Sequence, residues 1–119
     1  MASVPARKAE MPRTAIAQAP DLARMRSHAQ EAAGLLRSVG NPQRLLILCE
    51  LVGGEVGVGT LLQRMALSQS ALSQHLALLR EAGLVTVRRE GVQAFYALAE
   101  GPVRPLMRTL HDIYCGDAR

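Results

Sequence analysis

Uncharged side chains that form hydrogen bonds gather in one stretch of this chain. They are Gln69, Ser70, Ser73 and Gln74. The leucines around them recur at helical spacing, so these residues take positions where an exposed helix usually carries Glu and Lys. Helix stability does not explain them, because serine is a mediocre helix former. Hydroxyl and amide groups of this kind can bond to base edges in the major groove of DNA. The pattern predicts a helix that reads nucleic acid.

The chain also has two cysteines, Cys49 and Cys115, whose thiols could react. Two are too few for a disulfide-held scaffold, and in a reducing compartment such a pair is more often buried, metal-binding or redox-active. Composition alone favours the alternative in which neither cysteine has a chemical role. In that case Cys49 is a small apolar residue of a buried helix, and Cys115 lies at a frayed helix end. No nucleophile–base–orienter set, phosphate loop or carboxylate pair is evident. We therefore predict that the protein is not an enzyme.

The composition describes one small basic domain. Of 119 residues, 49% are hydrophobic and only 3% aromatic, so the core must be built from aliphatic side chains. The net charge of +4 and the pI of about 9.8 favour a polyanionic partner, either nucleic acid or an anionic membrane surface. The apolar runs are shorter than the ~20 residues that cross a bilayer. With no secretory signal evident, we expect a cytoplasmic protein without membrane contact.

Proline and helical periodicity divide the first part of the chain. Residues 1–20 contain three prolines and are expected to form a disordered tail. The domain is expected over residues 21–119, beginning with a helix at 21–38. A second helix is expected at 42–52, because Asn41 can cap it and proline is tolerated at its first position. This helix is apolar nearly all round, which is typical of a buried helix.

The rest of the chain predicts two helices, a hairpin and a last helix. A short helix is expected at about 58–66 and a longer one at 68–82, with a serine as its cap. Alternating residues predict strands at 84–88 and 92–98. A final helix begins near Pro102. The two middle helices form a helix-turn-helix and the hairpin forms a wing, so we expect a winged helix-turn-helix, mainly α with a β-hairpin wing, rather than a plain helical bundle.

Three segments carry a resemblance to a known family. They are residues 41–45 (NPQRL), 68–76 (SQSALSQHL) and 79–85 (LREAGLV). Through them the chain resembles the ArsR/SmtB family of bacterial repressors. The resemblance implies the element order α-α-α-α-β-β-α and a homodimer built on the first and last helices. It further implies that two recognition helices enter successive major grooves of double-stranded operator DNA.

The DNA contacts expected from this resemblance extend beyond the four polar residues of the recognition helix. Arg88 and Arg89, near the tip of the wing, are expected to meet phosphate or the minor groove. Arg80 could hold a phosphate or form an ion pair with a nearby carboxylate, and both alternatives stay open. His75 lies beside the apolar stripe, and we interpret it as a packed, hydrogen-bonded histidine rather than a base contact.

The metal sites of the family are not matched in this chain. The arsenic or cadmium site places cysteines at the start of the short third helix, where this chain has Gly57 and Gly59. The zinc or nickel site uses several residues of the last helix, which here offers His111 and Asp112. Adjacent helical residues point in different directions, and zinc takes about four ligands. We expect no bound metal and no cofactor.

The cysteines and the glycines instead resemble a dithiol subgroup of the family, the sulfide-responsive BigR/SqrR/HlyU-like repressors. In that subgroup the matching cysteines react with persulfides or oxidants. The resemblance implies that Cys49 and Cys115 form a disulfide or polysulfide bridge that releases the operator. Two alternatives remain open. One is a metalloid or soft-metal sensor that uses the same thiols, and the other is a winged-helix module for protein contacts, without an operator.

Overall fold

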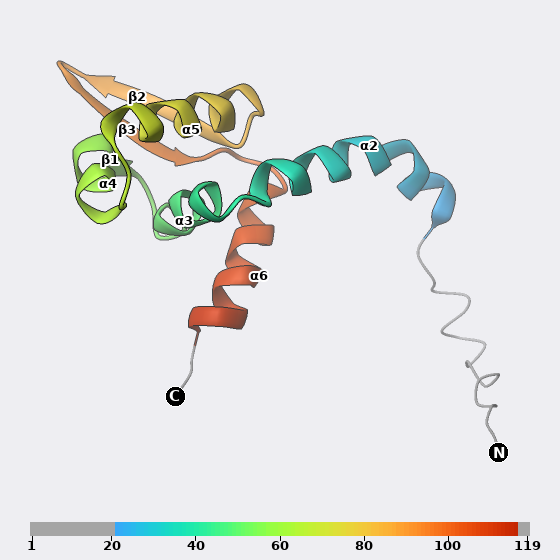
Figure 1. The fold of residues 1–119 in the computed structure, drawn as a ribbon. Coiled ribbons are helices and arrows are strands. Elements are labelled where there is room, and N and C mark those ends of the chain that lie inside the picture. The colour runs from blue at the N-terminus through green and yellow to red at the C-terminus, as the bar shows by residue number, and fades with distance from the viewer. Residues whose placement is uncertain (1–20, 117–119) are drawn as a thin grey trace. The chain divides into compact units, whose positions relative to one another are not determined.

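The computed structural model describes residues 21–116, and Figure 1 shows the order of its elements. They are α2 (Leu22–Val39), α3 (Pro42–Glu50), β1 (Val56–Gly57), α4 (Val58–Arg64), α5 (Gln69–Glu81), β2 (Val85–Glu90), β3 (Gln93–Leu98) and α6 (Val103–Cys115). The winged helix-turn-helix prediction is confirmed: four helices precede the hairpin and one follows it within this range. The expected tail at residues 1–20 lies outside the described residues.

The chain divides into two units between residues 32 and 33, and each is described by itself. Of the first unit, the structure describes only residues 21–32, which belong to the first part of α2. The second unit holds the end of α2 and every later element. No helix within residues 21–116 is long and apolar enough to cross a membrane.

Asn41 starts α3 in the way that its position predicts. Its side-chain oxygen accepts hydrogen bonds from the backbone N–H groups of Gln43 and Arg44, both at 3.0 Å, and Pro42 takes the first helical position. The helix ends at Glu50, two residues before the end we expected at residue 52. The N–H of Leu51 bonds to the carbonyl of Leu48, so the last turn tightens and the chain leaves the helix through a turn.

Replacing Asn41 with alanine is expected to destabilise the fold by about 1 kcal/mol, because two N–H groups lose their acceptor. Asn41→Asp keeps an acceptor oxygen and serves as the matched variant. Urea denaturation of both variants measures the difference. Equal unfolding free energies for the alanine and aspartate variants would show that the cap does not stabilise α3.

The wing is a hairpin whose register is continuous from Val85↔Leu98 at its base to Glu90↔Gln93 at its tip. Its turn lies at Gly91 and Val92, so β2 ends at Glu90, two residues beyond the predicted strand at 84–88, and Gly91 has a φ of 63°. A third strand, β1, pairs antiparallel with β3 and gives the sheet order β1-β3-β2. This strand was not predicted, since its two residues are too few to show alternation.

The helices pack an aliphatic core against one face of the sheet. From α5 come Leu72, Leu76 and Leu79, each at most 2% exposed. Val103 and Met107 tie the first half of α6 to the same core, with exposures of 1% and 0%. The core therefore fixes α5 beside the wing and the beginning of α6 under it, as Figure 1 shows.

Candidate nucleic-acid interface and thiol pair

The recognition helix α5 presents its polar residues to solvent because its core leucines are drawn to the other side. Ser68 caps the helix by accepting a hydrogen bond from the N–H of Ala71 at 3.1 Å. The helix then runs from Gln69 to Glu81, and the residues predicted to read bases are all exposed. These residues are Gln69, Ser70, Ser73 and Gln74. The surface available to a DNA groove is thus uncharged and rich in hydrogen-bonding groups.

The four polar residues do not share one environment. Gln69 and Ser73 line a groove between α5 and the wing, together with residues of α4 and β3. Ser70 and Gln74 do not line it. They follow Gln69 and Ser73 by one residue, which is a turn of about 100° around a helix. One polar face of α5, with Gln69 and Ser73, therefore borders the groove next to the wing. A second polar face, with Ser70 and Gln74, lies outside this groove.

Arg88 and Arg89, expected to act together, lie on opposite faces of the hairpin. The register pairs Arg89 with Ala94, on the face that packs against the helices, and Arg88 with Phe95, on the other face. Arg89 lines the groove beside α5. Adjacent positions in a strand diverge in this way, and only the register shows which of the two arginines faces the helices.

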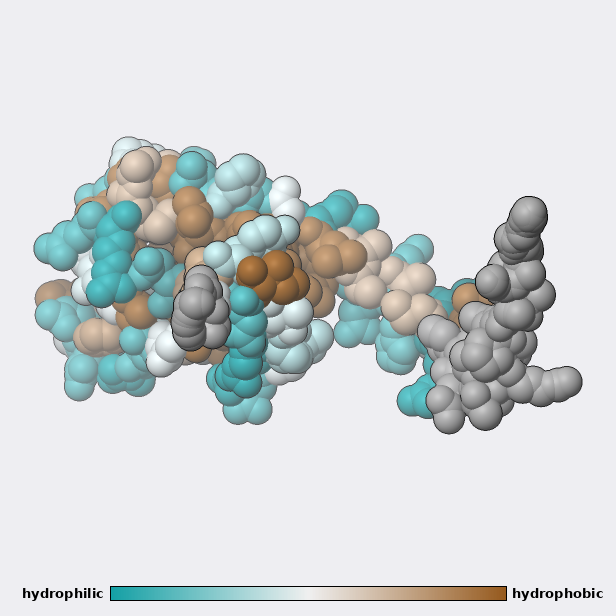
Figure 2. Space-filling model, turned by 90° about the horizontal axis from the view of Figure 1, so that it is seen from below, coloured by the Kyte–Doolittle hydropathy of each residue, from teal (hydrophilic) through white to brown (hydrophobic). Residues whose placement is uncertain are grey.

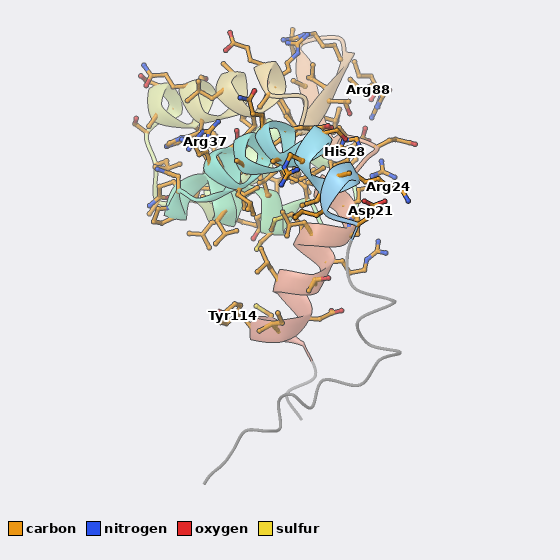
Figure 3. All side chains as sticks on the ribbon, turned by 90° about the vertical axis from the view of Figure 1, so that its right-hand side faces the viewer. Asp21, Arg24, His28, Arg37, Arg88 and Tyr114 are labelled. Carbon is orange, nitrogen blue, oxygen red and sulfur yellow. The ribbon has the colours of Figure 1, made fainter. Side chains whose placement is uncertain are left out.

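Arg88 is held by Glu55, a residue that the sequence did not single out. Its Nε and Nη2 donate to the two carboxylate oxygens of Glu55 at 2.9 and 3.0 Å, and its guanidinium lies 4.7 Å from the centroid of the Phe95 ring. The hydrogen bond from Arg88 holds the pKa of the Glu55 carboxyl below its usual range. Figure 3 shows Arg88 on the wing. No sequence signal predicts this pair, because it depends on the pairing of β1 with β3.

Arg80 and His75 both lie on α5, in different environments. Arg80 is exposed, lines the groove beside α5, and has no ion pair within residues 21–116. His75 is half-buried, as expected, but its Nδ1 is buried without a hydrogen-bond partner in the described part of the chain. The hydrogen bond that we expected for His75 is therefore not found at this nitrogen.

The cysteines lie on two helices that touch. Cys49 is half-buried on α3, Cys115 is exposed as the last residue of α6, and both are free thiols. Burial raises the pKa of the Cys49 thiol, and negative charge on Cys115 and on Glu50 raises it further. Within residues 21–116, no three His, Cys, Asp or Glu side chains gather at one point that could hold a metal ion.

Alkylation is expected to distinguish the two thiols. In the reduced protein at neutral pH, iodoacetamide should modify Cys115 before Cys49, because Cys115 is exposed and the raised pKa of Cys49 leaves less of the reactive thiolate. Peptide mass spectrometry over time measures both rates. The Cys49 rate should keep rising with pH beyond the range of an ordinary thiol. Equal rates at neutral pH would contradict this difference.

An exposed recognition helix beside a β-wing, on an aliphatic core, defines a winged helix-turn-helix DNA-binding protein. The family model described as "Bacterial regulatory protein, arsR family" matches residues 41–87, which cover α3 to the middle of β2. The transcriptional activator HlyU of Vibrio cholerae is 45% identical over 95 residues, which cover 80% of this chain and 88% of that protein. The chain belongs to the ArsR family and is a DNA-binding transcriptional regulator.

Solved structures of two relatives share the fold. The structure of reduced HlyU from Vibrio cholerae has a TM-score of 0.74 at 46% identity and covers 77% of this chain and 97% of that chain. The transcriptional repressor BigR from Xylella fastidiosa has a TM-score of 0.74 at 40% identity, covering 82% of this chain and all of the other (100%). The resemblance to the ArsR/SmtB family, with relatives HlyU and BigR, is confirmed.

Proposed function

We propose that this regulator is a homodimeric repressor whose affinity for its operator is switched by reaction of Cys49 and Cys115 with persulfides or oxidants. The observation that carries the proposal is the packing of α3 against α6, the two helices that carry the thiols. The pKa of Cys49 supports it, because negative charge on Cys115 adds to the increase caused by burial. One relative points the same way, since its solved structure is described as HlyU in a reduced form. The proposed DNA-binding and dimerisation domain covers residues 21–119.

In the proposed switch, a persulfide, R–S–SH, oxidises the two thiols to a disulfide. One thiolate attacks the outer sulfur of R–S–SH, displaces R–SH and becomes a protein persulfide. The second thiolate then attacks the protein's own sulfur in that persulfide, forms the Cys49–Cys115 disulfide and releases hydrogen sulfide. Two thiols lose two electrons and two protons, and the transferred sulfur gains them as sulfide. If a second R–S–SH first converts the other thiol into a persulfide, the attack of one protein persulfide on the other releases hydrogen sulfide and leaves one extra sulfur in the bridge, which then has a longer reach.

Closing this link brings two free thiols to the ~2.05 Å separation of a disulfide, and we propose that the end of α6 moves relative to α3 when it forms. The burial of α6 permits such a movement. Met107 anchors the first half at 0% exposed, whereas Ile113 and Tyr114 near the end are 64% and 81% exposed. Figure 3 shows Tyr114 projecting from the last turn of α6. The cross-link therefore acts on the part of α6 that the core does not hold.

The same exposed end of α6 is where we place a second copy of the chain. Figure 2, seen from below, shows brown hydrophobic residues among teal hydrophilic ones on this face of the molecule. The first helix, α2, separately exposes apolar side chains, namely Leu22, Met25 and Leu36. A dimer on these helices would hold two recognition helices at half-sites roughly 34–36 Å apart. Shifts of about an ångström or two at such an interface change that spacing.

The proposed base contacts are Gln69, Ser70, Ser73 and Gln74. Of the two arginines expected near the wing tip, Arg88 and Arg89, we propose that only one supplies a phosphate contact. Fluorescence anisotropy with a labelled operator tests the DNA-binding part of the proposal at several salt concentrations. The reduced protein should bind, and affinity should fall steeply with salt as phosphate contacts release counterions. A complex that does not respond to salt would favour a protein-interaction module instead. Tight stoichiometric binding of a metalloid with no response to persulfide would favour the metalloid sensor.

A further inference from the structure

We propose that the groove between α5 and the wing seats one sugar–phosphate strand of the DNA, with Arg80 and Arg89 holding its phosphates. The inference rests on the proposed function, in which α5 faces DNA, and it extends that function to a defined path for the backbone. It also assigns Arg80, whose role the sequence left open, and separates Arg89 from its neighbour Arg88.

The residues that line the groove match the chemistry of a sugar–phosphate strand. Its volume is about 420 Å³, and it opens between α4, α5 and the wing. Leucines form an aliphatic part of its wall, namely Leu62, Leu72 and Leu76. Its polar residues come from α5, β2 and β3. A sugar–phosphate strand alternates apolar deoxyribose with anionic phosphate, so an aliphatic wall beside cationic side chains matches both of its parts.

The charge of the groove is all of one sign. Arg80 enters from the last turn of α5 and Arg89 from β2, and no carboxylate is among the residues that line the groove. Neither arginine is ion-paired within residues 21–116. Gln69 and Ser73 lie on the same side of the helix and add hydrogen-bonding groups. Two guanidinium groups without a counter-charge attract a polyanion and suit the geometry of phosphate oxygens.

Arg88 provides the contrast within the same strand. It faces away from the groove, donates two hydrogen bonds to Glu55 and lies within 3.4 Å of a Glu90 carboxylate oxygen. A phosphate would have to displace these carboxylates before it could bind Arg88. We therefore assign the phosphate contact of the wing to Arg89 and use Arg88 as the charge-matched control.

The test compares three variants, Arg80→Gln, Arg89→Gln and Arg88→Gln, in operator titrations across a range of salt. The plot of log K against log salt has a negative slope, and loss of one phosphate contact makes that slope less steep by about 0.9. In a dimer, which loses the contact twice, the decrease in steepness is twice that amount. The Arg80 and Arg89 variants should show this decrease and should lose affinity for operator and random DNA by similar factors. The Arg88 variant should keep the wild-type slope, because the register of the hairpin persists without an exposed ion pair.

Charge-conserving variants complete the test. Arg80→Lys and Arg89→Lys should retain the slope, and circular dichroism melts should show that all five variants fold. Wild-type slopes for both Arg80→Gln and Arg89→Gln would overturn the assignment. An equally large decrease in steepness for Arg88→Gln would also overturn it. Each variant is also titrated after persulfide treatment. Unchanged slopes together with a normal loss of DNA affinity after persulfide treatment would contradict the phosphate-binding role of the groove but not the cysteine switch. The expected slopes without any effect of persulfide would contradict the cysteine switch alone.

Discussion

Replacing either cysteine with serine is expected to abolish the response of DNA binding to persulfide. The wild-type protein should lose about 5–150-fold in operator affinity on treatment, the usual range for coupling between two sites. Cys49→Ser and Cys115→Ser should bind the operator like reduced wild-type protein and keep that affinity after treatment. A lone thiol can become a persulfide, but it cannot form the link between α3 and α6. Fluorescence anisotropy before and after treatment measures both quantities.

The two single variants also separate the proposed switch from simple modification of one exposed thiol. If capping of Cys115 were enough to release DNA, Cys49→Ser would still respond, because Cys115 is the exposed thiol. The double variant serves as the control for effects of persulfide that do not involve cysteine. A full response in either single variant would rule out a mechanism that needs both sulfurs.

The second large effect is expected in the core, where two neighbouring leucines of α5 differ sharply. Leu79 is 0% exposed and belongs to the core cluster, whereas Leu78 is 50% exposed. Leu79→Ala should lower the free energy of unfolding by about 2–5 kcal/mol, since it removes buried methyl groups and leaves a cavity. Leu78→Ala should change it by about 0.5 kcal/mol or less.

Urea denaturation of the two alanine variants measures this difference on the same helix with the same chemical change. A loss of this size is a large part of the roughly 5–15 kcal/mol by which small domains are stable. The Leu79 variant should therefore also bind DNA poorly when warmed, through unfolding rather than through a lost contact. Similar unfolding free energies for the two variants would mean that α5 does not pack through Leu79.

The helices could be predicted from the sequence because their signals are local. Asn41 and Ser68 both cap helices in the structure through side-chain hydrogen bonds, as their positions indicated. The leucines of α5 mark its buried side, so its polar residues were identified as exposed. Val85 and Val87 alternate along β2 as expected, and they pair with Leu98 and Tyr96. Most of these features depend on residues within a few positions of one another.

The missed features depend on residues that are distant in the chain. The pairing of β1 with β3 joins Val56 to Tyr96, and its two residues carry no periodicity. Glu55 directly precedes β1 and forms an ion pair with Arg88. Arg88 therefore has a carboxylate partner that the neighbouring wing arginine lacks within the described residues. The groove that contains Arg80 and Arg89 likewise exists only after α5 and the hairpin have packed. Sequence alone therefore identified the cationic residues but not their directions.

The cysteine pair was predicted from the sequence, although its two residues are distant in the chain. No local pattern in the sequence brings Cys49 near Cys115, and the link was implied only by resemblance to a dithiol subgroup. The packing of α3 against α6 supplies a physical basis for it, because charge on Cys115 contributes to the raised pKa of Cys49. The exposed last turn of α6 is the part of the fold that such a link would move.

The measurement that tests this account most directly is the operator affinity of the protein once its two sulfurs are joined. Persulfide-treated protein is separated from the reduced form, its bridge is located by mass spectrometry of unreduced peptides, and both fractions are titrated with the same operator. We predict a peptide pair linked through Cys49 and Cys115, weaker binding by that fraction, and recovery of affinity after reduction with dithiothreitol. A linked fraction that binds the operator as tightly as the reduced protein would contradict the account.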